Sequence, residues 1–166
     1  MFVEFDSLYV CVSIELDEYY RYKLTTKIIK EHIYNYCEYG YVSDFNTSKM
    51  TNMENLFSDC DYFNQSLNDW DVFNVTTMNY MFAKCYYFNQ PLNEWDVSNV
   101  TTMHCMFYMC DKFNQPLNDW NVSNVTTMRA MFHGCSKFNQ PLKNWNVSND
   151  LDTMWMFTGS LKKGFN

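Results

Sequence analysis

The chain has 166 residues, enough for one domain of ordinary size, with 47% hydrophobic and 19% charged residues. It can therefore bury a core, and this composition excludes a disordered tail. Four glycines and three prolines are too few for a collagen-like chain or a glycine-cradled nucleotide site. A net charge of −7 argues against a nucleic-acid binder, whose footprint is basic, and no apolar run approaches the roughly 18 residues of a membrane span.

Residues 1–41 do not repeat, and we expect them to form an N-terminal cap. The β-prone stretch over residues 3–16 predicts one or two strands, and residues 24–39 predict a helix that ends before Gly40. A stack of repeats needs such a cap because a terminal coil otherwise exposes its apolar interior and a free edge.

The opening stretch does not have the pattern of a secretion signal. Glu4 and Asp6 interrupt it, and no Lys or Arg occurs before Arg21. We therefore expect an intracellular location (virion or host cytoplasm if the chain is viral) rather than secretion, with cysteines kept as thiols.

Residues 42–166 contain a 25-residue repeat in nearly five copies. The first unit is looser and has Phe45 at the tryptophan position. The last unit shifts by one residue relative to the others between Val147 and Met154. A period of 25 is too short for a helix pair and fits one turn of a leucine-rich-repeat-type solenoid. The repeat positions that we expect to form the core are Trp70, Trp95, Trp120, Trp145, Cys60, Cys85, Cys110, Cys135, Phe57, Phe82, Phe107 and Phe132.

Two hydrophobic periods alternate within each unit. Leu92, Trp95 and Val97 face inward around acidic residues, which predicts a short strand. Met103, Met106, Phe107 and Cys110 recur at i, i+3, i+4 and i+7, which predicts a short helix or helical turn. The expected fold is an α/β repeat: a right-handed leucine-rich-repeat-like solenoid with a parallel sheet on one side and short helical turns on the other.

The cysteine ladder has three interpretations. Stacked cysteines about 5 Å apart lie near disulfide or thiolate–metal distances. Each of them, however, lies on the apolar face three residues before a Phe, where a free Cys behaves as a small hydrophobe. Core packing is therefore favoured, and no metal site or cofactor is expected.

The outward positions of the expected strands are the candidate partner-binding residues. They fall into two columns that grade from acidic to amide side chains. These residues are Asp69, Asp71, Glu94, Asp96, Asp119, Asn121, Asn144 and Asn146. Three roles for these columns remain open: they bind a protein, they form a solvated polar face without a ligand, or their stacked carboxylates bridge calcium.

No catalytic motif is present, so we do not expect an enzyme. His32, His104 and His133 occupy unrelated repeat positions, and there is no metalloprotease motif, nucleophile elbow or phosphate-binding loop.

The repeats resemble those of a known family. The string from Phe88 to Thr101 (FNQPLNEWDVSNVT), followed by Met106-Phe107-x-x-Cys110, resembles BspA-like leucine-rich-repeat surface proteins, and more closely their mycoplasma-type lipoprotein repeats. The resemblance spans roughly residues 24–160. It implies a leucine-rich-repeat-like solenoid with a binding or adhesion role, and such repeats also occur in large DNA viruses and protists.

We therefore expect a non-catalytic interaction module that binds an unknown protein through its strand face. One alternative is a structural protein that joins other chains through an open last coil around Met156, Phe157 and Phe165. Another is a surface adhesin on a cell or a virion. Residues 41–110 carry a net charge of −6 (eight acidic, two basic) and residues 111–166 a net charge of +2 (four acidic, six basic), so weak end-to-end self-association is also expected.

Overall fold

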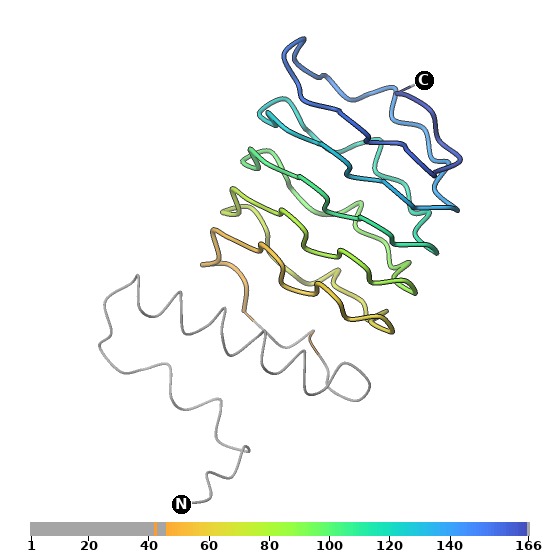
Figure 1. The fold of residues 1–166 in the computed structure, drawn as a ribbon. Coiled ribbons are helices and arrows are strands. Elements are labelled where there is room, and N and C mark those ends of the chain that lie inside the picture. Colours follow the sequence, from red (N-terminus) through yellow and green to blue (C-terminus); the bar gives the residue numbers. More distant parts are fainter. Residues whose placement is uncertain (1–41, 43–45, 166) are drawn as a thin grey trace, which may run out of the picture.

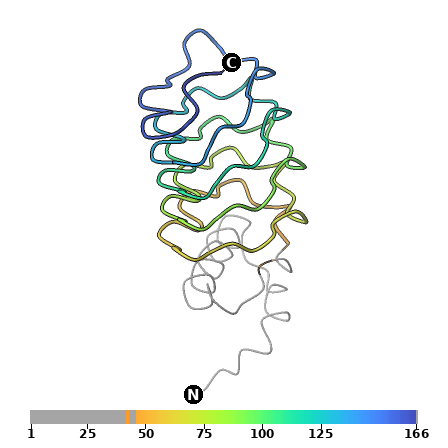
Figure 2. The same ribbon diagram turned by 90° about the vertical axis from the view of Figure 1, so that its right-hand side faces the viewer.

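The computed structural model describes residue 42 and residues 46–165, in which the repeats form a stack of coils. Figures 1 and 2 show successive coils lying one above another, with the last at the C-terminal end of the stack. We number the repeats by their ranges: repeat 1 is 46–69, repeat 2 is 70–94, repeat 3 is 95–119, repeat 4 is 120–144 and repeat 5 is 145–165. The predicted cap, including the helix over 24–39, lies outside the described residues.

The predicted α/β solenoid is wrong for the part of the chain that the structure describes. Residues 46–165 contain no helix and no extended strand, so there are no element bounds to give and no parallel sheet with helical turns. Parallel pairing between repeats is reduced to isolated bridges at one position. The bridged pairs are Asn52–Thr77, Thr77–Thr102, Thr102–Thr127 and Thr127–Asp152.

The expected helix is replaced by a series of tight turns. In repeat 3 the amides of Met106 and Cys110 donate to the carbonyls three residues earlier, Met103 and Phe107, at 3.2 and 3.0 Å. The third residue of each turn has a left-handed backbone. Cys105 in the turn 103–106 has a φ of 54°, and Met109 in the turn 107–110 has a φ of 59°. A helix cannot continue through left-handed residues, whereas turns with a positive φ at their third position need them.

Most of the remaining amides of this segment bond to the next repeat, whereas that of His104 donates to the Asn79 side chain of the preceding repeat at 2.9 Å. Cys105 donates to the carbonyl of Arg129 at 2.9 Å, and Phe107 donates to that of Met131 at 3.0 Å. Amides thus alternate between a turn within the repeat and a bond to its neighbour. Nearly all backbone donors must be paired in a buried segment, and this alternation pairs them without a helix or a sheet.

The expected strand is also absent. The Trp95 amide donates to the Leu92 carbonyl at 3.2 Å, which closes a turn where an extended chain was expected. The in-out alternation of side chains survives, because Trp95 is 4% exposed while Glu94 and Asp96 on either side are exposed.

The core is formed by aromatic rings that stack from repeat to repeat. Phe82 and Phe107 have ring centroids 5.5 Å apart and nearly parallel planes, and Phe107 and Phe132 follow at 5.6 Å. A second column passes through Phe88 and Phe113 at 5.9 Å. Each fully buried aromatic side chain contributes about 1.5–3 kcal/mol relative to exposure, so these columns hold the repeats together.

Candidate binding surface

The structure places all eight sequence-predicted partner-binding residues on the outside of the stack. Each is exposed, and each lies next to a buried tryptophan of the repeat. We call Asp69, Glu94, Asp119 and Asn144 the first column, and Asp71, Asp96, Asn121 and Asn146 the second column. The first column lies in turns and the second column in irregular segments rather than on a strand face, and the members of each column are 25 residues apart in sequence.

The tryptophan between the two columns is fixed by a buried hydrogen bond. The Trp95 indole donates to the Leu67 carbonyl at 3.0 Å, and the Trp120 indole donates to the Leu92 carbonyl at 2.9 Å. Both partners lie 28 residues earlier in the chain. The same bond recurs at Trp70 and Trp145, so every repeat presents its two polar neighbours in one register.

The second column has a local structural role. The carboxylate of Asp96 accepts the Ser98 amide at 3.0 Å, and that of Asp71 accepts the Phe73 amide at 3.0 Å. Asn121 makes the same contact with Ser123, which is a turn that Asx side chains favour. Hydrogen bonds from the Ser98 side chain and amide hold the pKa of Asp96 below its usual value, so this carboxylate is charged at neutral pH.

The first column is less engaged with the protein. Glu94 accepts a hydrogen bond from the side chain of the adjacent Asn93 at 2.5 Å, and Asp119 contacts the Asn144 amide group at 3.5 Å. These partners are themselves exposed. The first column therefore carries the carboxylates that are most available to a partner.

The columns do not form a metal site in the described part of the chain. Among residues 42 and 46–165, no three His, Cys, Asp or Glu side chains come close enough together to hold a metal ion. Calcium bridging, which the sequence left open, thus has no structural support there.

The cysteine ladder packs in the core. Cys85, Cys110 and Cys135 are completely buried, and each thiol donates to a Phe carbonyl of the preceding repeat, at 3.0, 2.9 and 2.8 Å. Cys60 is 8% exposed. Burial raises the pKa of Cys110 and of Cys135, so both remain protonated at neutral pH. The remaining core candidates, four Trp and four Phe, are all at most 6% exposed.

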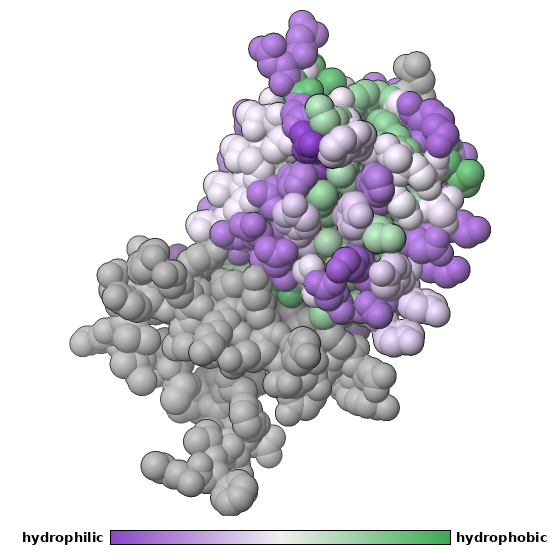
Figure 3. Space-filling model, in the orientation of Figure 1, coloured by the Kyte–Doolittle hydropathy of each residue, from purple (hydrophilic) through white to green (hydrophobic). Residues whose placement is uncertain are grey.

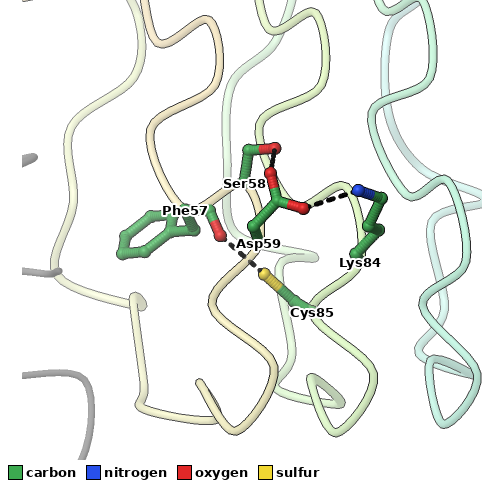
Figure 4. A network of polar contacts seen from close by, with 5 residues as sticks. All are labelled: Phe57, Ser58, Asp59, Lys84 and Cys85. Carbon is green, nitrogen blue, oxygen red and sulfur yellow. Dashed lines mark hydrogen bonds and ion pairs between the residues drawn. The ribbon is translucent and has the colours of Figure 1, made fainter.

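A second outer surface was not predicted from the sequence. Tyr62 and Tyr87, 66% and 51% exposed, stack with ring centroids 5.3 Å apart. Asp59 and Lys84 form an ion pair of 2.7 Å between the same two repeats (Figure 4). The hydrogen bond from Lys84 lowers the pKa of Asp59. The signal was available, because both pairs are spaced by 25 residues, but neither pair recurs in repeats 3 to 5.

A polar cluster joins His104 and Cys105. His104 Nδ1 lies 3.0 Å from the Arg129 carbonyl and donates to it, because a carbonyl only accepts. In the neutral ring the other nitrogen, Nε2, then accepts a hydrogen bond from the Tyr80 hydroxyl at 2.7 Å. The Cys105 thiol lies 3.6 Å from Nε2. Burial raises the pKa of Cys105, which is opposite to the activation that a nucleophilic cysteine needs.

The outer surface as a whole is mixed in polarity. Figure 3 shows hydrophilic side chains interspersed with small apolar patches over the face that it draws. In the part of the chain that the structure describes, no helix could cross a membrane.

Comparison with known proteins gives one match. A family model described as "Mycoplasma protein of unknown function, DUF285" matches residues 30–129 and 93–166. No curated protein and no solved structure matches the chain significantly.

Proposed function

We propose a non-catalytic, protein-binding function for this chain, which belongs to the DUF285 family of mycoplasma-type repeat proteins. We place its repeats in the BspA-like branch of such proteins, on the motif that runs from Phe88 to Cys110. The binding surface in this proposal is the side of the stack that carries the first and second columns.

One observation carries the proposal: the two columns are exposed at every repeat while the tryptophan between them is fixed. The indole of Trp95 is 4% exposed and hydrogen-bonded, whereas Glu94 and Asp96 on either side are exposed. A surface that is already ordered loses little conformational entropy when a partner binds. Repeat proteins commonly use such extended, regular faces for binding.

The charge of the columns defines the partner chemistry. Carboxylates occupy the first three positions of the first column, at Asp69, Glu94 and Asp119, and the first two of the second column, at Asp71 and Asp96. Such a face attracts a partner with Lys or Arg side chains, chiefly by raising the association rate, and salt weakens this attraction. We therefore propose a basic protein surface as the ligand.

Cys105 does not have the lowered pKa of an activated nucleophile, which supports a non-catalytic role. Cys105 and His104 are the pair that most resembles a catalytic arrangement among the described residues, and burial of Cys105 favours its protonated thiol.

The test is affinity capture from the native cell with a matched pair of variants. Asp69→Asn with Glu94→Gln removes two charges from the first column, and Asp61→Asn with Asp150→Asn removes two exposed charges elsewhere. The melting temperature should change little in either, because Asn144 already occupies a first-column position. We expect the first pair to lose captured proteins that the control pair retains. Equal capture by both variants would contradict the proposed face.

A further inference from the structure

The turn that follows Asp71 carries an aromatic ring where the other repeats carry a hydroxyl. Phe73 is 51% exposed on this turn. The equivalent residues of the other repeats are all serines: Ser48, Ser98, Ser123 and Ser148. The turn around Phe73 closes through the Val75 amide and the Val72 carbonyl at 2.9 Å, and the turn around Ser98 closes at the same distance. The ring is therefore not needed for the backbone of the turn.

The Phe73 ring has no aromatic partner. Within residues 42 and 46–165, it stacks on no other ring. Covering an exposed ring removes apolar surface from water, which favours binding. A single exposed apolar side chain is ordinary on a protein surface, however, so the groups beside the ring decide what it can bind.

The carboxylate of Asp71 beside the ring has unused acceptor positions. In repeat 4 the Asn121 side chain accepts both the amide and the hydroxyl of Ser123, at 3.2 and 2.8 Å. Asp71 accepts the Phe73 amide at 3.0 Å, and a phenylalanine has no hydroxyl to donate. Among the described residues, no second donor reaches this carboxylate. Because two carboxylate oxygens accept several hydrogen bonds, most of this capacity is left for a partner.

The turn is held in place from both sides. The Asn74 side chain donates to the Ser48 carbonyl of repeat 1 at 2.8 Å. The Asn99 side chain of repeat 3 donates to the Phe73 carbonyl, also at 2.8 Å. A ring and a carboxylate on a turn that is already ordered lose little conformational entropy when a partner binds.

We propose that Asp71 and Phe73 together bind one arginine side chain of the partner, and we call this pair the arginine subsite. This inference rests on the proposed function, since it assigns a specific contact within the same acidic face. The guanidinium lies on the Phe73 ring and donates hydrogen bonds to the Asp71 carboxylate. Because the Phe73 amide bonds to that carboxylate, the ring and the carboxylate lie close enough for one guanidinium to contact both.

The chemistry of the two groups favours arginine over other side chains. A guanidinium is planar and weakly hydrated, so its face packs on an aromatic ring while its edge donates two parallel bonds to a carboxylate. The lysine ammonium is a compact, strongly hydrated charge without this planar edge. An apolar side chain would cover the ring but would also remove the Asp71 carboxylate from water without pairing it. An acidic side chain would be repelled by Asp71 and by the exposed Asp69 and Asp96.

The test is an NMR titration of the full chain with the acetylated, amidated heptapeptide Gly-Arg-Gly-Arg-Gly-Arg-Gly and with its lysine counterpart. We expect the arginine peptide to bind about threefold more tightly and to shift the ring resonances of Phe73. Phe73→Ser should weaken binding of the arginine peptide about threefold and remove its advantage over the lysine peptide. Asp71→Asn should also weaken this binding. Both variants should keep the melting temperature, because Ser98 and Asn121 occupy these positions in other repeats.

Tyr62→Ser is the matched control, because it removes another exposed ring that lies outside the two columns. It should leave the affinity for both peptides unchanged. Equal affinity of the arginine peptide for the unmodified chain and for Phe73→Ser, or an equal loss in Tyr62→Ser, would overturn the arginine subsite.

The variant Asp69→Asn with Glu94→Gln separates failure of the subsite from failure of the proposed function. If this variant weakens peptide binding and Phe73→Ser does not, the arginine subsite is wrong and the acidic face stands. If neither variant weakens binding, the acidic face is wrong as well.

Discussion

The indole nitrogen of Trp120 donates a hydrogen bond of 2.9 Å to the carbonyl oxygen of Leu92, which lies 28 residues earlier. Trp120 is 3% exposed and Leu92 is completely buried. The indole that begins repeat 4 thus bonds to a carbonyl of repeat 2. Side-chain and backbone hydrogen bonds therefore both join the repeats.

Replacing Trp120 by Phe should therefore destabilise the protein. The change removes one of the two hydrogen bonds that the buried Leu92 carbonyl accepts, the other being from the Trp95 amide at 3.2 Å, and it leaves the space of one ring unfilled. We therefore expect a loss of about 2–4 kcal/mol in the free energy of unfolding, measured in urea. Trp155→Phe is the control, because that side chain is 57% exposed and lies over Arg129 at 4.4 Å. Its cost should stay below about 1 kcal/mol. Equal costs would show that the buried indole bond contributes nothing.

Gly134 should tolerate no side chain. Its φ is +74°, and an added Cβ would lie 3.2 Å from Met109 Cγ. We expect Gly134→Ala to lower the free energy of unfolding by about 1–2 kcal/mol, since a left-handed conformation costs Ala energy and Met109 must move. Gly164→Ala is the matched control, because nothing lies within 4 Å of its added Cβ. The measurement is the melting temperature of both variants. Equal melting temperatures for Gly134→Ala and Gly164→Ala would contradict the prediction.

The 25-residue repeat and its buried positions could be predicted from sequence, but the backbone conformation could not. Met103, Met106, Phe107 and Cys110 are all buried, as helical spacing requires. A series of turns closed by bonds three residues apart buries the same positions, so the hydrophobic period does not distinguish it from a helix. The residue that interrupts the helix is Cys105, with a φ of 54°. Non-glycine residues seldom adopt this conformation, so the sequence carries no sign of it.

Asn64, Asn89 and Asn114 form a ladder in which each side chain accepts the amide of the asparagine 25 residues later. This ladder should stabilise the folded protein wherever a further repeat follows. Asn114 Oδ1 accepts the Asn139 amide at 2.9 Å, and the Gln140 side chain at 3.1 Å. We expect Asn114→Ala to cost about 1–2 kcal/mol in urea unfolding, because it removes both of these hydrogen bonds. Asn139→Ala should cost less, because the Asn139 side chain accepts no such bond within the described residues. The reverse order of the two costs would contradict a structural ladder.

The buried thiols should make stability fall in alkaline solution. Burial raises the pKa of Cys110 and Cys135 in the folded state above the unfolded value. The unfolded chain therefore loses protons first as the pH rises above about 8.5, which favours unfolding by about 1.4 kcal/mol per thiol at pH 9.5. This stabilisation is fully present below the unfolded pKa.

The measurement compares urea unfolding at pH 7.5 and pH 9.5 for the unmodified chain and for the Cys110→Ala, Cys135→Ala double variant. Other groups titrate in the same range, but they are common to both proteins. We expect the double variant to lose less stability between the two pH values, and an equal loss in both would count against buried, protonated thiols.

The candidate surface was predictable in position but not in detail. Asp69 and Asp71 flank a buried tryptophan, and alternation alone places them outside whether the backbone is a strand or a turn. The Asx turn that engages Asp71 could not be anticipated, because a strand was expected there. The stacked pair Tyr62 and Tyr87 was missed because apolar rings were assigned to the core.

The most direct test of the stacked-repeat architecture is amide hydrogen exchange at Phe107 and Phe157 in a sample at low micromolar concentration. The two residues occupy the same repeat position, but within residues 42 and 46–165 only the Phe107 amide has an acceptor, the Met131 carbonyl at 3.0 Å. We predict strong protection of the Phe107 amide and exchange of the Phe157 amide close to the rate of an unprotected amide. Rapid exchange at Phe107, or equal protection at both, would contradict the backbone bonds between repeats on which the fold rests.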